Sequence, residues 1–456
     1  HRSPERSGFT ERPVEQFGVV RTGRPTEHDN VIGEVRQRAV LPSVQCRLPC
    51  KCAAFNRLVR HVRDVATLSS AEETARRKAF RANDQATTSP VWNHGQMTGR
   101  PRSAVAALPG YKPGRSAAAA AAEHGIADAI KMASNELPYG PLPSVAGAIS
   151  AGIEHIGLYA DHGATALREE LAQFVGVDTE QVTIGAGSAG ILQQLLLSYV
   201  GSGDQVAMCW PSFEAYPLFA ALVEAEQVRV PLVDETFDLV ALAAAITDKT
   251  KLVFVTNPNN PTGTIVPTAD IAEFLRTVPQ TCLVVLDEAY LEFVTDERVT
   301  DSIALLADHS NLVITRTFSK AHGLAGLRVG YALGHREVIG MIDRTLVPFA
   351  INELAQRAAR ASLGAADEMR TRVAELVSER TRVVNSLRST GWEIPDPQGN
   401  FVWLPVLDDA AALGIDLERQ GVVTRAFPDV GVRVTIASAE WNDRFLAALA
   451  TVRPQS

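Results

Sequence analysis

Three short segments of this 456-residue chain combine reactive side chains with residues that fix the backbone. The NPNNPTG segment (257–263) holds asparagines in a loop that its prolines make rigid. The DEAY segment (287–290) ends an apolar run with a carboxylate and a phenol, and the TFSK segment (317–320) ends another with a hydroxyl and an amine. Such groups in a poorly solvated crevice are suited to nucleophilic and acid–base catalysis. Taken singly, each segment has an ordinary alternative: a turn, a helix cap or a solvated lysine.

A fourth segment, GAGSAG (185–190), formally matches the GxGxxG pattern of dinucleotide-binding loops. The next predicted strand (205–210) ends without the acidic residue that would bind a ribose hydroxyl, which argues against a nucleotide. Small residues at a helix N-terminus still leave backbone amides free to bind another phosphate or anion. We therefore favour a phosphate site here, with a nucleotide site and a purely structural turn as alternatives.

The elements that must position these groups follow from short β-branched runs that alternate with amphipathic segments. Buried strands are predicted at 181–187, 205–210, 251–257, 282–289, 311–318 and 328–334. Repeated strand–helix units predict parallel pairing with helices on both faces, and ligands in such α/β sheets bind at the carboxyl ends of the strands. After Asn352, one or two long helices are expected. Further strands at 400–405, 422–427 and 431–438, closed by a helix from Glu440, predict a smaller α+β domain.

Charge divides the chain near Met97. Residues 1–96 hold 16 Lys and Arg against 10 Asp and Glu, whereas the remainder holds 28 against 42. We expect 1–96 to be disordered or a non-native upstream segment, and a metal site in its CRLPCKC run (46–52) is disfavoured because no second pair of ligands has suitable spacing. The predicted domains are an N-terminal arm joining the small domain (97–150), a large domain (151–347) and a small C-terminal domain (348–456).

Overall composition excludes several classes of protein. A net charge of −8 and a pI near 5.8 argue against a nucleic-acid or anionic-membrane partner. No run of 18 apolar residues predicts a spanning helix, and the five cysteines do not form a disulfide scaffold. The sequence also lacks the apolar region of a secretory signal, so we expect a cytoplasmic protein without a metal.

Taken together and in this order, NPNNPTG, DEAY and SKxxGLAGLRxGY resemble the motifs of the class I/II aminotransferases, which are fold-type-I pyridoxal-phosphate enzymes. Within that family the chain is similar to the branch of histidinol-phosphate and aromatic amino acid aminotransferases. The resemblance runs from about Leu108, in LPGYKPG, to about Ala450. It implies an α/β fold with a large, mostly parallel sheet of the seven-stranded type and a smaller α+β C-terminal domain.

The resemblance also implies roles around the ring of pyridoxal 5′-phosphate. Lys320 would form the internal Schiff base and later move the substrate proton. Asp287 would pair with the pyridinium nitrogen and keep the ring electron-accepting. Tyr290 and Asn260 would bind the ring phenolate oxygen, and Phe213 would stack on the ring face. Arg328 and the crevice would disfavour the charged form of the lysine.

The phosphate of the cofactor would be bound by the amides of Ser188 and Ala189, by the Ser319 hydroxyl and by Arg328. Tyr159 matches a tyrosine that reaches the phosphate bound by the partner subunit. The resemblance therefore implies a homodimer with shared active sites.

For the substrate, the resemblance assigns the α-carboxylate to Arg433, which a guanidinium binds bidentately. Asn135 belongs to the segment that closes over the substrate. Arg425 matches an arginine that binds the substrate phosphate in histidinol-phosphate enzymes, although aromatic enzymes carry one there too and a surface charge is the alternative.

Two departures decide the preferred substrate. Histidinol-phosphate enzymes commonly read GSDE where this chain reads GSAG (187–190), and Tyr-Pro-Asp where it reads YAD (159–161). The WPSFEAYP (210–217) and VPFAINELAQ (347–356) segments look like the actinobacterial phenylalanine type. We therefore expect transamination between an aromatic L-amino acid and a 2-oxo acid such as 2-oxoglutarate, with histidinol phosphate as the alternative donor. Minor alternatives are a decarboxylase of phosphorylated threonine and a PLP-binding transcription regulator.

Overall fold

The computed structural model describes residues 99–108, 110 and 114–453. The CRLPCKC run and the predictions for residues 1–96 lie outside this part of the chain. Within it, none of the helices has both the length and the apolar character needed to cross a bilayer.

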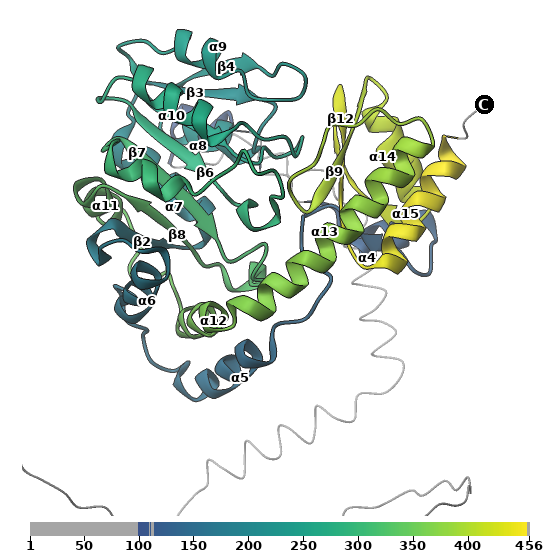
Figure 1. Ribbon diagram of the computed structural model, residues 1–456, viewed down its shortest axis with the longest axis horizontal. Helices are drawn as coiled ribbons and strands as arrows, with labels where there is room; N and C mark the ends of the chain where they lie inside the picture. The colour runs from purple at the N-terminus through teal and green to yellow at the C-terminus, as the bar shows by residue number, and fades with distance from the viewer. Residues whose placement is uncertain (1–98, 109, 111–113, 454–456) are drawn as a thin grey trace, which may run out of the picture. The chain divides into compact units, whose positions relative to one another are not determined.

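The larger sheet has seven strands in the order β2-β8-β7-β6-β5-β3-β4, and most of its pairs are parallel, as predicted (Figure 1). Its strands are β2 (Val182–Gly185), β3 (Gln205–Trp210), β4 (Glu226–Pro231), β5 (Thr250–Thr256), β6 (Leu283–Asp287), β7 (Leu312–Thr317) and β8 (Gly330–Gly334). The expectation of parallel pairing is wrong for β8, which runs antiparallel to both neighbours. The connection from β7 to β8 contains only a short 3₁₀ turn, Ala325–Leu327, and therefore lacks the crossover helix that a parallel return needs. The sequence did not predict β4, a mostly polar strand at the sheet edge.

Helices cover both faces of this sheet because its strands alternate side chains between two apolar layers. Leu252 and Phe254 of β5 pack in one layer, whereas Val253 and Val255 pack in the other. The first layer is closed by α7 (Gly187–Tyr199), α8 (Ala215–Leu222) and α11 (Arg336–Asp343), and the second by α6 (Thr165–Val175), α9 (Leu239–Ala244) and α10 (Thr268–Thr277). The sheet is thus buried on both sides, and its strand ends are held rigidly.

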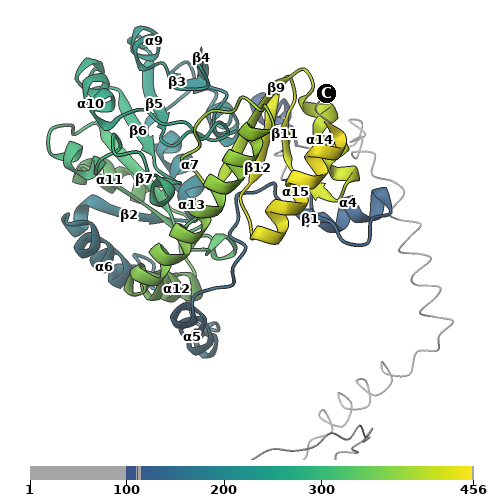
Figure 2. The same ribbon diagram turned by 45° about the vertical axis from the view of Figure 1, so that its right-hand side comes forward.

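The smaller sheet is antiparallel, in the order β11-β12-β9 (Figure 2). Its strands are β9 (Phe401–Leu407), β11 (Arg425–Phe427) and β12 (Val430–Thr435), accompanied by α14 (Ala410–Arg419) and α15 (Ala439–Val452). The single strand predicted at 422–427 is wrong. It divides at Thr424 into β11 and β10 (Val422–Val423), and β10 pairs instead with β1 (Ile130–Lys131).

Two consecutive helices follow Asn352, namely α12 (Glu353–Gly364) and the long α13 (Ala366–Ser389). The remaining helices of the described chain are α3 (Ser103–Ala106), α4 (Ala117–His124) and α5 (Pro143–Gly152). In both views α13 runs from beside the larger sheet to the smaller one, and α5 lies against α12 (Figures 1 and 2).

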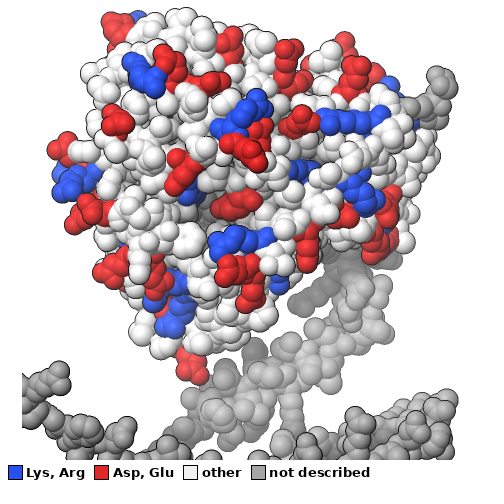
Figure 3. Space-filling view, in the orientation of Figure 1, with Lys and Arg blue, Asp and Glu red and all other residues white. Residues whose placement is uncertain are grey.

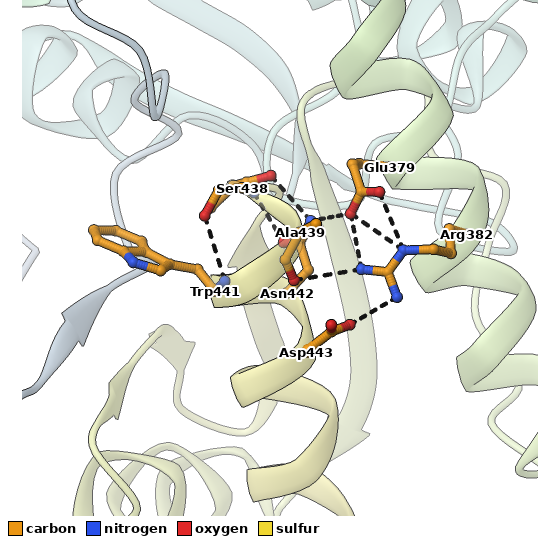
Figure 4. Close-up of polar contacts among 8 residues, drawn as sticks. Glu379, Arg382, Ser438, Ala439, Trp441, Asn442 and Asp443 are labelled. Carbon is orange, nitrogen blue, oxygen red and sulfur yellow. Dashed lines mark hydrogen bonds and ion pairs between the residues drawn. The ribbon is translucent and has the colours of Figure 1, made fainter. Parts of the chain in front are cut away.

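Polar contacts dock α15 on α13 (Figure 4). Arg382 of α13 bridges Glu379, one turn earlier, and Asp443 of α15, each at 2.8 Å. Asn442 donates to Glu379 at 3.0 Å and accepts from the backbone amide of Ala437 at 2.9 Å. The contact of Asn442 with Ala437 lies two residues beyond the end of β12, the strand that carries the predicted substrate residue Arg433.

Acidic and basic side chains are interspersed over the face of the molecule shown in Figure 3. The described part of that face carries no large region of a single sign.

Candidate active site

A cavity of about 240 Å³ opens at the carboxyl ends of β5, β6 and β7, where the sequence motifs end. It also receives residues from the segment after β1, from the start of α7 and from β11 and β12. The predicted site residues that line it are Ser188, Ala189, Phe213, Asn260, Asp287, Tyr290, Ser319, Lys320, Arg328, Arg425 and Arg433. The sheet thus brings residues from four distant motifs into one space.

Lys320 follows β7, and its amine lies against the segment after β1. Its Nζ donates to the backbone carbonyls of Ser134, at 3.0 Å, and Asn135, at 3.2 Å. Burial lowers the pKa of Lys320 to about 7, and the positive charge of Arg433, followed by that of Arg328, acts in the same direction. A substantial fraction of this amine is therefore uncharged near neutral pH, so it can act as a nucleophile or a base.

Asp287 is the last residue of β6 and is only 3% exposed. Its Oδ2 accepts a hydrogen bond from the hydroxyl of Tyr216 at 2.8 Å, whereas its Oδ1 is buried with no hydrogen-bond partner among the described residues. Burial raises the pKa of Asp287 to about 6, although interactions with Tyr216, with Thr315 and with the backbone amide of Ala289 lower it in part. A buried carboxylate oxygen of this kind needs a donor, and a protonated ring nitrogen would supply one.

Sequence reasoning missed Tyr216 and Thr256, which hold this carboxylate. The Tyr216 hydroxyl lies 2.8 Å from both Asp287 Oδ2 and Thr256 Oγ1, and its ring stacks on Phe254 with centroids 4.0 Å apart. Because burial and the neighbouring carboxylate raise the pKa of Tyr216, the phenol stays protonated and donates. The sequence feature that could have indicated Tyr216 is its position three residues after Phe213, which places both residues around the start of α8.

Tyr290 and Asn135 lie side by side, although only Tyr290 lines the cavity. The amide of Asn135 donates to the Tyr290 hydroxyl at 2.9 Å, and its side-chain oxygen accepts from Thr435 at 3.1 Å. Asn135 is fully buried in a left-handed backbone conformation, with φ of 53°. The predicted substrate-closing residue therefore positions the phenol and is not itself among the cavity-lining residues.

Arg433, on β12, is oriented from several sides. It donates to the side-chain oxygen of Asn260 and, at 2.6 Å, to the backbone carbonyl of Ala133. Its guanidinium also lies 5.6 Å from the ring centre of Phe401 and 5.9 Å from that of Phe427. These contacts fix the plane of the guanidinium, which a bidentate carboxylate site requires.

The predicted phosphate site is formed where α7 begins. Gly187 has a φ of +74°, and a side chain there would collide with the guanidinium of Arg328. Arg328 donates to Ser319 at 3.2 Å and to the backbone carbonyl of Ala325 at 2.9 Å. A guanidinium, a hydroxyl and the first amides of a helix thus meet at one end of the cavity, which suits a phosphate.

Two predicted residues are placed differently. Arg425 lines the cavity, but its guanidinium forms an ion pair with Glu214 at 2.8 Å, a partner that the sequence analysis did not identify. Tyr159 is 84% exposed, stacks on Phe349 with centroids 4.5 Å apart, and is not among the residues that line the cavity. Within one chain the structure therefore does not bring Tyr159 to the other site residues.

The residues present fit a pyridoxal phosphate group: a lysine of lowered pKa, a buried carboxylate oxygen without a donor and a phosphate cradle lie around one cavity. No group of three or more His, Cys, Asp and Glu side chains in the described chain could hold a metal ion.

Comparison with known proteins agrees with this chemistry. The family model described as aminotransferase class I and II matches residues 127–449. Proteins named aromatic amino acid aminotransferase are similar to the chain: that of Thermobifida fusca is 48% identical over 77% of this chain and 96% of its own length, and that of Mycolicibacterium vanbaalenii is 46% identical over 77% and 97%. The crystal structure of histidinol-phosphate aminotransferase from Sinorhizobium meliloti in complex with pyridoxal-5′-phosphate superimposes with a TM-score of 0.73 at 29% identity, over 79% of this chain and 98% of that one. This chain therefore belongs to the class I and II aminotransferase family.

Proposed function

We propose that the protein transfers the amino group of an aromatic L-amino acid to a 2-oxo acid such as 2-oxoglutarate, using pyridoxal 5′-phosphate held at Lys320. The observation that carries the proposal is the pairing, in one cavity, of a lysine whose pKa is about 7 with a buried carboxylate oxygen that lacks a donor. The aromatic specificity is supported by relatives that are 44–48% identical and named for it.

When bound, the cofactor supplies an electron-accepting ring that stabilises negative charge on the substrate α-carbon. Asp287 would keep the ring nitrogen protonated, while Tyr216 holds the carboxylate in place. Once the substrate amine has displaced Lys320 from the cofactor, the lysine amine, largely neutral above pH 7, would accept the α-proton of the substrate at Nζ. Arg433 orients the substrate by its α-carboxylate, so that the proton points to this amine.

The other side chains hold the cofactor. Arg328, Ser319 and the amides of Ser188 and Ala189 would bind its phosphate, and Tyr290 and Asn260 would donate to the ring oxygen, since all of these residues line the cavity. Phe213, which also lines it, would stack on the ring. None of these residues moves a proton, and their common effect is to exclude water and fix the geometry.

Histidinol phosphate is the second candidate donor, because Arg425 lines the same cavity and offers a cation to a phosphate. The ion pair of Arg425 with Glu214 opposes this reading, since a phosphate would have to compete with a carboxylate already bound.

The proposal includes a homodimer in which Tyr159 completes the site of the partner subunit. Tyr159 stacks on Phe349, and both side chains are exposed. Further exposed apolar side chains lie near these two residues in the sequence, namely Ile153, Ile156, Leu158 and Val347. Exposed apolar side chains concentrated in this way are typical of protein–protein interfaces. A cytoplasmic location also belongs to the proposal, and cell fractionation would test it.

Single half-reactions test the function directly. Purified holoenzyme is mixed with L-phenylalanine, L-tyrosine or histidinol phosphate alone, and conversion of the cofactor is followed by its absorbance. We expect the aromatic amino acids to react faster than histidinol phosphate. Borohydride reduction followed by peptide mapping should label Lys320, and Lys320→Ala should lose both the label and all turnover. A label elsewhere, or turnover by Lys320→Ala, would contradict the proposal.

A further inference from the structure

An ion pair between Glu214 and Arg425 stands in the wall of the active-site cavity. The Glu214 carboxylate accepts from Arg425 Nη2 at 2.8 Å through each of its oxygens and from Nε at 3.1 Å. The arginine side chain is 17% exposed and the glutamate side chain 36% exposed. Both residues line the cavity, so this pair meets whatever part of a substrate enters there.

Within the described part of the chain, the hydrogen bonds that the Glu214 carboxylate accepts all come from Arg425. Glu214 immediately precedes α8, a position from which a side chain often caps the helix, yet its carboxylate makes no capping hydrogen bond. It turns instead toward β11, which is distant in sequence. The neighbouring residue Phe213 also lines the cavity, so the backbone at this point carries two adjacent pocket residues.

The position of Arg425 makes its charge relevant to the substrate. Arg425 lies directly opposite Arg433 in the register of β11 and β12, and both side chains line the cavity. The guanidinium carbon of Arg425 also lies over the ring of Phe427, 5.8 Å from its centre. If Arg433 binds the α-carboxylate, the second guanidinium on the adjacent strand is placed to meet a longer anionic group that takes the position of the carboxylate.

We propose that Glu214 determines specificity by acting as an internal counter-ion for Arg425. The inference rests on the proposed function and concerns the anionic group of the substrate, because histidinol phosphate carries a phosphate ester in place of the α-carboxylate. That longer phosphate group must displace the Glu214 carboxylate before it can bind the Arg425 guanidinium bidentately. An aromatic side chain enters without breaking the pair, and the pair neutralises a charge that would otherwise be desolvated beside it. Specificity here arises from an element that disfavours the competing substrate.

The test compares half-reactions of wild-type and Glu214→Gln holoenzyme with L-phenylalanine and with histidinol phosphate. No 2-oxo acid is added as amino acceptor, so its own negative charges do not affect the measured rate constants. We expect the ratio of the second-order rate constants, histidinol phosphate over phenylalanine, to rise about tenfold or more, because a charged hydrogen-bond pair becomes available to the phosphate. The change should lie mainly in the apparent dissociation constant of histidinol phosphate, since Arg425 is not placed at the reacting atoms.

Glu136→Gln is the matched control. Glu136 lines the same cavity and loses the same charge, but its carboxylate pairs with Lys131 at 2.9 Å. The ratio should change less than about twofold in this variant, as expected for a site that does not contact Arg425. The double variant Glu214→Gln, Arg425→Met should not show the rise in this ratio.

The results separate the inference from the proposed function. Failure of the wild type to react with phenylalanine would overturn the proposed function. Reaction of the wild type with phenylalanine, but an unchanged ratio in Glu214→Gln or an equal rise in Glu136→Gln, would overturn the role of Glu214 alone. Glu214→Ala must shift the ratio in the same direction, so the outcome does not depend on the folding of one variant.

Discussion

The carboxyl group of Asp287 shows how function opposes stability at a single residue. Burial at the end of β6 raises its pKa from 3.8 to about 6, and one of its oxygens has no hydrogen-bond partner among the described residues. Without a ligand, the folded protein therefore holds a carboxylate that would be better solvated in the unfolded chain. A cofactor that brings a protonated nitrogen to this position would remove the penalty.

Asp287→Asn should consequently stabilise the apoprotein and lower its affinity for the cofactor. Because the folded pKa lies above the unfolded value, the wild-type penalty is absent below pH 3.8, grows as the pH rises and is complete above about pH 6. We expect the variant to gain about 3 kcal/mol in free energy of unfolding at pH 8 and almost nothing near pH 4. Urea denaturation of both apoproteins at the two pH values measures this. A gain that is equal at both would show that the charge of Asp287 is not the cause.

At this scale the sequence could predict the types of the reacting residues but only part of their surroundings. It identified Lys320 and the crevice around it, and it named Arg328 as the neighbour that disfavours the lysine charge. In the structure burial acts first and Arg433 second, with Arg328 contributing less. Arg433 lies 113 positions later in the chain, and no local pattern indicates that the two charges meet.

Individual strands show the same limit on what the sequence can predict. The motifs that end β5, β6 and β7 meet because parallel neighbours share one edge, which the alternation of strands and helices was sufficient to predict. The antiparallel β8 and the division of 422–427 into β10 and β11 depend on partners chosen elsewhere in the fold. A periodic pattern reveals that a segment is extended and does not reveal which strand it joins.

The helix α8 supplies the next prediction, because its first turn brings the Tyr216 hydroxyl to Asp287. Tyr216→Phe removes a hydrogen bond that lowers the pKa of this carboxylate, so the pKa should rise further above 6. In the pH profile of cofactor binding to the apoprotein, measured by a titration followed by absorbance, the acid limb should then move to higher pH, and the affinity for the cofactor should fall. Tyr199→Phe, a tyrosine on α7 that is not among the cavity-lining residues, is the control. Unchanged profile and affinity in Tyr216→Phe would show that α8 does not tune Asp287.

In the whole molecule, the residues that line the cavity come from segments spread along the chain from Gly114 to Arg433. The larger sheet contributes the lysine and the carboxylate, the segment after β1 contributes the carbonyls that accept from the lysine, and the smaller sheet contributes two arginines. Within this single chain, Tyr159 does not take up its predicted place in the site, because its side chain is exposed beside Phe349. In the proposed homodimer, a second copy of the chain would supply this tyrosine to the phosphate end of the cavity.

Subunit mixing tests this assembly. Lys320→Ala removes the amine from its own site but keeps Tyr159, whereas Tyr159→Ala keeps the amine and removes the tyrosine. If Tyr159 serves the partner, a mixed dimer contains one site with both groups, and activity should rise above that of either variant alone after the subunits exchange. With equal amounts and random exchange, half of the dimers are mixed and each has one complete site, so about a quarter of wild-type activity is expected. Proven exchange without any rise would mean that Tyr159 acts within its own chain or not at all, because only a tyrosine supplied across the interface can restore the Lys320 site of its neighbour.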